Sequence, residues 1–429
     1  MSTPFVPAVQ ARPETFAVRA ADHIDRGRRR GHELSTGIDS ALSAYRRFFS
    51  HLSIAEVDVT GAAASSHAQL REWAPTAAEE VAAVADGAGI EVTELMEIIA
   101  RTEIMTQAPA APTECSTISH TRPGASVAAQ NWDWAVDFST LWHINDVGAV
   151  PGQHRHVGIA EYGMLGKIGL NEAGVGVLLN ILKHRADGPG GVPVHMILER
   201  VLSEAGSLAE ALEIIHSAPT SSSSIITVIT AEAAVQVEIA GEAKRERRAG
   251  ADGFLVHTNH FLHPDLLDGS LELRPGSTSR ARLRHLDEAV AGLSAGRSEA
   301  AGGSAHGGSA HGDPARADGD PARAEGDPAR AEGDPVRAEG DPARAEAAEA
   351  APSETGPGSS GPVTIGDLTK LLTTGPDEPP VCAVPGPDAA YGDRSATLVT
   401  VRIDPGRKQI DLAPGSPAEG LRGNRRFQL

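Results

Sequence analysis

The chain has 429 residues and a formal net charge of -19 at pH 7, and 40% of its residues are hydrophobic although only 3% are aromatic. A chain of this length can bury a core rich in Ala, Val, Leu and Ile, whereas its acidic balance, without a clustered basic face, excludes a nucleic-acid-binding protein. The start lacks the apolar core of a signal peptide, no apolar run is long enough to span a membrane, and two cysteines suit a reducing compartment, so we expect a cytoplasmic protein without a membrane partner.

Residues 1–114 have a mainly helical pattern. Thr76 and Glu79 match a capping box at the start of a helix, and Leu95, Ile98 and Ile99 line one helical face. The sequence therefore predicts that residues 1–114 form a helical pro-segment.

From Cys115 onward the pattern changes to short β-rich runs that are separated by Gly, Asn and Asp turn signals. These runs occupy residues 126–132, 175–180, 224–230, 234–240 and 253–261, and helical periodicity appears at 192–206 and 207–219. Residues 115–295 are therefore expected to combine strands with helices.

Residues 296–361 have low complexity and include five tandem heptads of the type GDPARAE. Gly-Asp-Pro would break a helix in every repeat, and no large apolar residue recurs to form a coiled-coil seam, so we expect a disordered insertion. Beyond it, residues 396–414 have the pattern of a hairpin whose turn is Asp404-Pro405-Gly406. The residues after the insertion are too few for a core of their own, so residues 115–295 and 362–429 are expected to form one α+β domain.

Cys115 is the main candidate for chemistry. A free cysteine is most often a buried structural thiol, but this one lies where the helical pattern gives way to the first β-rich run. A cut at that junction would make Cys115 the first residue of a new chain, and its α-amine, with a pKa of about 7.7 to 8.0, could then act as its general base. We therefore predict that Cys115 is the nucleophile of an amide-processing enzyme and is activated by cleavage directly before it.

Four short motifs occur in one order along the chain. They are Glu114-Cys115-Ser-Thr, QNWDW at 130–134, HTNHF at 257–261 and GDRSATL at 392–398, and Asp133 follows Cys115 by 18 residues. In these motifs the chain resembles the acyl-coenzyme A:6-aminopenicillanic acid acyltransferases and related amidohydrolases, which are N-terminal-nucleophile hydrolases. The glycine-rich segment 168–180 is also similar to the strand-turn-strand that follows the nucleophile in that family.

The resemblance implies a four-layer α-β-β-α sandwich and a set of catalytic residues. Cys115 would attack the scissile carbonyl, Asp133 would orient the freed amine or the nucleophile, Asn259 would donate a hydrogen bond to the oxyanion, and Arg394 would stabilise charge near the nucleophile. The residues alone leave other roles open. Asp133 could form a turn, Asn259 could cap a strand end, and Arg394 could be a surface residue before an edge strand.

Cleavage is expected between Glu114 and Cys115. Well-known members of the family cut between glycine and cysteine, but an N-to-S acyl shift depends mainly on strain and on Cys115, so Glu114 does not prevent it. The products would be an α subunit, residues 1–114, and a β subunit from residue 115, which stay associated as a heterodimer. The substrate would be a small amide or thioester that acylates Cys115, without a cofactor or metal; a coenzyme A thioester is compatible as acyl donor.

Two alternative functions remain open from the sequence. An uncut cysteine hydrolase could use His257 or His260 as its base, or the protein could bind acylated small molecules without catalysis. A metal site built from these histidines with His154 and His156 lacks an HExxH or paired CxxC pattern. Cys382 has no neighbouring base and is expected in the core.

Overall fold

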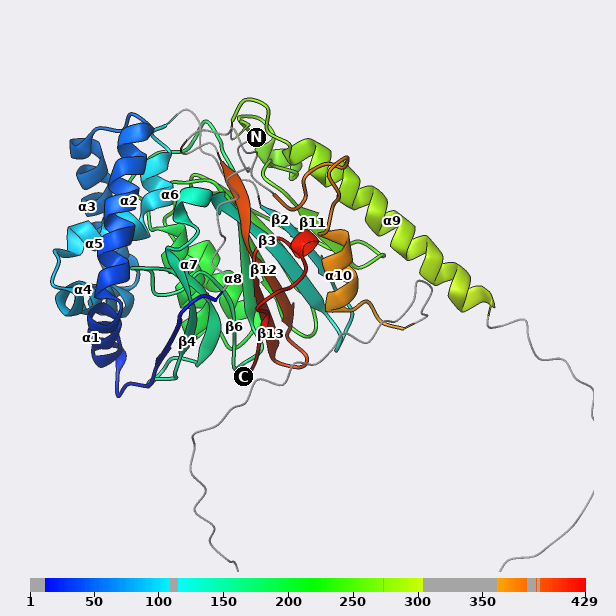
Figure 1. The fold of residues 1–429 in the computed structure, drawn as a ribbon, viewed down its shortest axis with the longest axis horizontal. Coiled ribbons are helices and arrows are strands. Elements are labelled where there is room, and N and C mark those ends of the chain that lie inside the picture. Colours follow the sequence, from blue (N-terminus) through cyan, green and yellow to red (C-terminus); the bar gives the residue numbers. More distant parts are fainter. Residues whose placement is uncertain (1–11, 109–114, 273, 304–360, 384–390, 392–393) are drawn as a thin grey trace, which may run out of the picture. The chain divides into compact units, whose positions relative to one another are not determined.

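The computed structural model describes residues 12–108, 115–272, 274–303, 361–383, 391 and 394–429 (Figure 1). Two predictions fall largely outside these ranges, namely the Glu114 side of the cleavage site and the repeats within residues 304–360. The chain divides into a compact unit made of residues 1–293 and 362–429 and a second unit, residues 294–361. The following description concerns the first unit unless stated otherwise.

The N-terminal part consists of one strand followed by a series of helices. The elements are β1 (Thr15–Val18), α1 (His23–Glu33), α2 (Ser35–His51), α3 (Glu56–Trp73), α4 (Pro75–Ala88), α5 (Val92–Ile99) and α6 (Arg101–Met105). The expected capping box is wrong, because Pro75 takes the first helical position of α4 and Thr76 lies inside the helix. The expected face of α5 is confirmed, because Leu95, Ile98 and Ile99 are fully buried.

The first sheet has eight strands in the order β1-β4-β5-β6-β7-β8-β9-β10. Its further members are β4 (Trp142–Val147), β5 (His156–Glu161), β6 (Ile168–Asn171), β7 (Gly176–Ile181), β8 (Ser224–Ile229), β9 (Ala234–Ala240) and β10 (Ala243–Arg248). Neighbouring strands are antiparallel except β1 and β4, which run parallel. Helices α7 (Val194–Glu204) and α8 (Leu208–Ser217) pack on this sheet.

The second sheet has six strands in the order β11-β2-β3-β12-β13-β14. Its members are β2 (Ser116–His120), β3 (Val127–Ala135), β11 (Phe254–His257), β12 (Ser395–Asp404), β13 (Gln409–Pro414) and β14 (Arg425–Gln428). Strand β12, which follows the insertion in sequence, pairs with β3, which precedes it. The residues beyond the insertion therefore complete a sheet begun at Cys115, and the expected hairpin is formed by β12 and β13.

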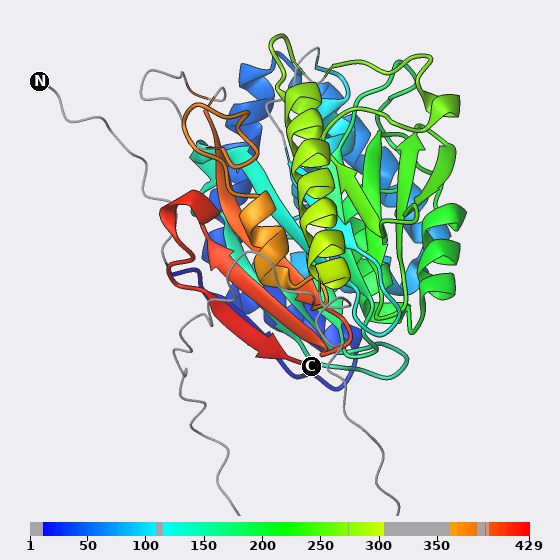
Figure 2. The same cartoon turned by 90° about the vertical axis from the view of Figure 1, so that its right-hand side faces the viewer.

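The two sheets pack face to face between layers of helices (Figures 1 and 2). Apolar side chains from both sheets and from the N-terminal helices form one large core. The outer face of the second sheet forms a smaller core with α9 (Ser279–Gly303) and α10 (Ile365–Leu371), in which Ile118 and Val127 pack with Leu286 and Leu368. The predicted α+β class with four layers, α-β-β-α, is thus confirmed.

Helix α9 overlaps the first residues of the insertion that is expected at 296–361. Helix α9 continues to Gly303, so residues 296–303 are helical. This segment contains Ser, Glu and Ala but no proline before the pair Gly302-Gly303, and a helix already begun at Ser279 can therefore propagate through it. Within the described residues, no helix is long and apolar enough to cross a membrane.

Candidate active site

Cys115 directly precedes β2 and is only 3% exposed. Its Sγ lies 3.7 Å from the main-chain oxygen of Asp133 on the neighbouring strand β3. The residue borders a cavity of about 10 Å³, which has room for roughly one water molecule. The cavity is lined by Arg101, Cys115, Trp132, Asp133, Trp134, Lys167, Leu179 and Ile181.

The Cys115 thiol is a weak acid in the continuous chain. Burial raises its pKa to about 12, and the negative charge of Asp133 acts in the same direction. Lys167 and Arg282 oppose this rise because a positive charge favours the thiolate. At neutral pH the thiol is therefore protonated, and it needs a nearby base before it can attack a carbonyl carbon.

Asp133 lies beside Cys115, but the atom of Asp133 that contacts the Cys115 sulfur is its main-chain oxygen rather than its carboxylate. Successive side chains of a strand point to opposite faces of the sheet, so the side chains of Asp133 and Asn131 lie on the same face. On that face Asn131 Nδ2 donates a hydrogen bond to the main-chain oxygen of Leu372. Asp133 Oδ1 accepts a hydrogen bond from Thr397 Oγ1 at 2.6 Å, and that hydroxyl accepts one from the Ala383 amide at 2.8 Å.

Strand β12 has an irregularity at this point. Asp133 pairs with Thr397 and Trp132 with Val399, so Leu398 is an extra residue in the register. Such bulges re-aim side chains and occur often beside active sites. The bulge places the Thr397 hydroxyl against the Asp133 carboxylate, within a part of the sheet that is fully buried.

Asn259 follows β11 and is 1% exposed. Its Oδ1 accepts a hydrogen bond from Arg282 Nη2 at 2.9 Å, and its Nδ2 donates to the main-chain oxygen of Ile181 at 2.9 Å. Arg282 Nη1 also donates to the main-chain oxygen of Cys115 at 2.8 Å. Asn259 is therefore connected to the main chain of Cys115 through one arginine, and to the cavity wall through Ile181.

Arg394 lies at a different place from the other predicted residues. Its Nη2 is 3.1 Å from Asp137 Oδ1, and the side chain is 21% exposed. It does not line the Cys115 cavity. The cations that do so are Arg101 and Lys167, so a direct electrostatic role of Arg394 at the thiol remains a prediction.

Arg101 and Lys167 form a buried charged cluster that the sequence did not reveal. Arg101 Nη2 lies 2.7 Å from Glu161 Oε1, and Lys167 Nζ lies 2.5 Å from the same oxygen. Burial alone would raise the pKa of Glu161, but the two cations outweigh it and hold that pKa below its usual range. The Tyr45 hydroxyl donates to the other oxygen of Glu161.

The same two cations lie over the tryptophans of β3. Arg101 is 4.3 Å from the ring centre of Trp134, and Lys167 is 3.8 Å from that of Trp132. Burial lowers the pKa of Lys167 to about 8, although Glu161 counteracts this. No local motif could have identified these residues, because Arg101 belongs to the helical segment before Cys115 and Lys167 to a loop before β6.

The histidines considered as alternative bases are engaged elsewhere. His257 Nε2 contacts Glu238 Oε1 at 2.9 Å and its Nδ1 contacts the Thr258 oxygen at 3.0 Å. His260 Nδ1 contacts Ser279 Oγ at 2.7 Å. Neither lines the Cys115 cavity, and no group of three or more His, Cys, Asp or Glu side chains suited to a metal ion occurs within the described residues.

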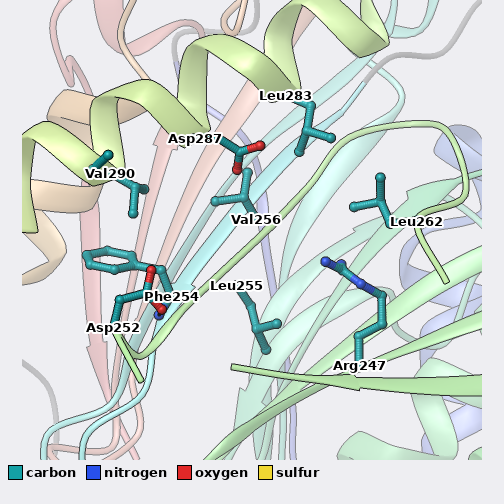
Figure 3. A pocket seen from close by; sticks show the side chains of 10 residues that line it. Arg247, Asp252, Phe254, Leu255, Val256, Leu262, Leu283, Asp287 and Val290 are labelled. Atoms are coloured by element: carbon teal, nitrogen blue, oxygen red, sulfur yellow. The ribbon is translucent and has the colours of Figure 1, made fainter. Parts of the chain in front are cut away.

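A larger cavity of about 380 Å³ lies between β10, β11 and α9. Figure 3 shows Arg247 on β10 and Asp287 on α9 among the side chains that line it, together with apolar side chains such as Phe254 and Val256. None of the predicted catalytic residues lines this cavity. Of the predicted catalytic residues, Cys115 and Asp133 line the smaller cavity.

Comparison with known proteins supports the resemblance. Residues 120–300 match the family model of acyl-coenzyme A:6-aminopenicillanic acid acyl-transferase. The 40 kDa form of acyl-coenzyme A:6-aminopenicillanic-acid-acyltransferase from Emericella nidulans is 33% identical over 222 residues, which are 50% of this chain and 60% of that relative. The chain's resemblance to this acyltransferase family, which the four motifs predicted, is thus confirmed.

Two solved structures are also similar to the chain. Penicillin V acylase from Agrobacterium tumefaciens has a TM-score of 0.33 at 12% identity, covering 70% of this chain and 83% of that protein. A variant of conjugated bile acid hydrolase from Clostridium perfringens has a TM-score of 0.38 at 12% identity, covering 73% and 96% respectively.

Proposed function

We propose that this protein is a self-processing enzyme with an N-terminal cysteine, which cleaves or transfers the acyl group of a small N-acyl compound through a thioester on Cys115. The observation that carries the proposal is the contact between Cys115 Sγ and Asp133 in a buried cavity at the start of β2, within a chain that matches an acyltransferase family. The chain spans about 60% of the length of the curated relative that it matches.

Maturation would begin at the peptide bond between Glu114 and Cys115. The Cys115 sulfur attacks the Glu114 carbonyl carbon, the C–N bond breaks, and the nitrogen takes up a proton to become a free amine. Water then hydrolyses the resulting thioester, which restores the thiol and leaves a carboxylate on Glu114. The uncut chain has no free α-amine at Cys115 to act as the general base, so it would be inactive toward other substrates.

Catalysis would then use the new amine as the base. It accepts the thiol proton while the sulfur attacks the substrate carbonyl, and it gives that proton to the departing amine. The carboxylate of Asp133 is suited to orient the amine rather than the sulfur, because it is held by Thr397 on the face of the sheet opposite to the Trp132 side chain. Water or an acceptor amine finally takes the acyl group from Cys115.

Three groups would assist this reaction electrostatically. Asn259 would donate to the oxyanion that forms on the substrate carbonyl, and Lys167 and Arg282 would favour the thiolate. The curated relative is named for 6-aminopenicillanic acid and acyl-coenzyme A, so amides of small acids and acyl thioesters are the substrates to test first. A hydrolysis assay comes before a transfer assay, because acyl transfer requires an amine to outcompete water for the thioester.

Intact mass measurement tests the proposal. The wild type should appear as two fragments that separate between Glu114 and Cys115, whereas Cys115→Ala should remain one chain. Incubation with an N-acyl amide should add the acyl mass to the fragment that starts at Cys115. A wild type that stays uncut and still hydrolyses amides would refute self-processing, and would favour the uncut alternative with a histidine base.

A further inference from the structure

Arg282 lies one turn into α9 and its side chain is fully buried. Its Nη1 donates to the Cys115 main-chain oxygen and to Ser116 Oγ, both at 2.8 Å. Its Nη2 donates to Asn259 Oδ1 at 2.9 Å, and its Nε donates to Thr278 Oγ1 at 3.0 Å. One guanidinium group therefore joins the nucleophile's residue to Asn259 across two sequence-distant segments.

These contacts determine which way the Asn259 amide points. A guanidinium group can only donate hydrogen bonds, so the Asn259 atom beside Arg282 must be the oxygen. The main-chain oxygen of Ile181 can only accept, so its partner must be the NH2 group. Two independent neighbours thus select the same orientation and hold the NH2 group at Ile181, which lines the Cys115 cavity.

The first turn of α9 also holds the main chain of Asn259. The Asn259 amide donates to Ser279 Oγ at 2.8 Å. On the other side, Asn180 Nδ2 donates to the Cys115 main-chain oxygen at 3.1 Å, alongside Arg282. Asn259 and the Cys115 carbonyl are therefore fixed relative to one another by a buried hydrogen-bond network with Arg282 at its centre.

We propose that Arg282 is a positioning residue that locks the Asn259 amide with its NH2 group toward the reacting carbonyl. This inference rests on the proposed function, in which Asn259 supplies a donor to the oxyanion. An NH2 group carries two N–H bonds, and Ile181 engages one of them, which leaves the other for the substrate oxygen. Without Arg282 only the Ile181 oxygen selects this orientation, so the NH2 group is held less firmly toward the oxyanion.

The first variant is Arg282→Met, which keeps much of the side-chain volume but removes every donor. Loss of one oxyanion donor lowers kcat by about 100-fold to 1,000-fold, so a loss of that order is expected with little change in KM. Arg282→Lys keeps the positive charge and should retain more activity. The matched control is Arg280→Met on the same helix, because Arg280 is 61% exposed and its carboxylate partner Glu272 is 3.9 Å away.

A double-mutant cycle separates positioning from general structural damage. If Arg282 acts through Asn259, Arg282→Lys should cause almost no further loss of kcat when Asn259 is already Ala, because the lysine keeps the positive charge that favours the thiolate and the two changes then remove one interaction. Rates are expressed per cut chain, with cleavage measured by mass spectrometry. Losses that multiply in the double variant would overturn the inference, as would an Arg282→Met enzyme with normal kcat.

The experiments distinguish a failure of the positioning role of Arg282 from a failure of the proposed function. If the wild type forms no acyl adduct on Cys115, the proposed function fails whatever the Arg282 variants do. If the adduct forms and the losses multiply, only the positioning role fails. Should Arg282→Met not fold, the cycle with Arg282→Lys still decides the question, since its loss should vanish in the Asn259→Ala background.

Discussion

Thr397 provides a direct test of how the Asp133 carboxylate is held. Thr397→Val keeps the shape of the side chain but removes the hydroxyl that donates to Asp133 Oδ1 at 2.6 Å. A hydrogen bond to a charged group is worth about 1.5 to 3 kcal/mol, and each 1.36 kcal/mol in a barrier corresponds to about tenfold in rate. If the carboxylate must be fixed to orient the new amine, kcat should fall by roughly 10-fold to 150-fold.

A second threonine on the same strand serves as the control. Thr400 is also fully buried, and its Oγ1 lies 3.3 Å from Asn131 Oδ1 and 3.1 Å from the Gly415 oxygen. Thr400→Val should lower the melting temperature about as much as Thr397→Val while leaving kcat nearly unchanged. Both variants would be assayed for cleavage, melting temperature and amide hydrolysis. A Thr397→Val enzyme within twofold of wild type, or equal losses in both variants, would refute the reasoning.

Three further outcomes are expected. Lys167→Met should raise the pKa of the Cys115 thiol in the cut chain, because it removes a positive charge that favours the thiolate. The pH dependence of the rate of alkylation by iodoacetamide should then shift to higher pH. Lys167→Arg keeps the charge and should prevent most of that shift. Burial raises the pKa of Glu103 from its ordinary value of 4.5 to about 7. Between these two pH values the folded chain binds more protons than the unfolded chain, so the wild type loses stability as the pH rises. The melting temperature of Glu103→Gln relative to wild type should therefore rise from pH 5 to pH 8, and a constant difference would contradict this. Deleting residues 304–355 should leave kcat within about twofold, because the entropy of closing a loop changes slowly with its length, and a large loss would assign the repeats a role in catalysis.

The sequence predicted the elements whose patterns are local. The runs around β3, β7, β8 and β9 combine β-branched residues with turn signals, and the structure contains strands there. Strand β10, with the sequence AKRERR, escaped this approach because it has no large apolar residue and is extended through its pairing with β9 at the edge of the sheet. Strand β1 was missed for a similar reason, since its partner β4 lies far along the chain.

The residues of the candidate site likewise fall into those that a local motif predicted and those that no motif predicted. Cys115 and Asp133 lie near each other in sequence on paired strands, so a motif with fixed spacing was sufficient to bring them together. Arg101, Lys167 and Arg282 come from three separate elements and have no motif around them. Their importance follows from burial beside the thiol, and burial depends on how helices and sheets pack, which no local pattern records.

The pair formed by Arg101 and Glu161 has a consequence for what maturation can achieve. Arg101 precedes the expected cleavage site and Glu161 follows it, and both side chains are at most 3% exposed. Separating them would remove one of the two cations that neutralise the buried Glu161, and removal of one partner from a buried ion pair costs about 3 to 5 kcal/mol. After cleavage before Cys115, the N-terminal fragment would therefore stay bound as part of the folded protein rather than dissociate as a propeptide. An expression system that supplies only residues 115–429 should yield a protein in which the cavity at Cys115 lacks Arg101.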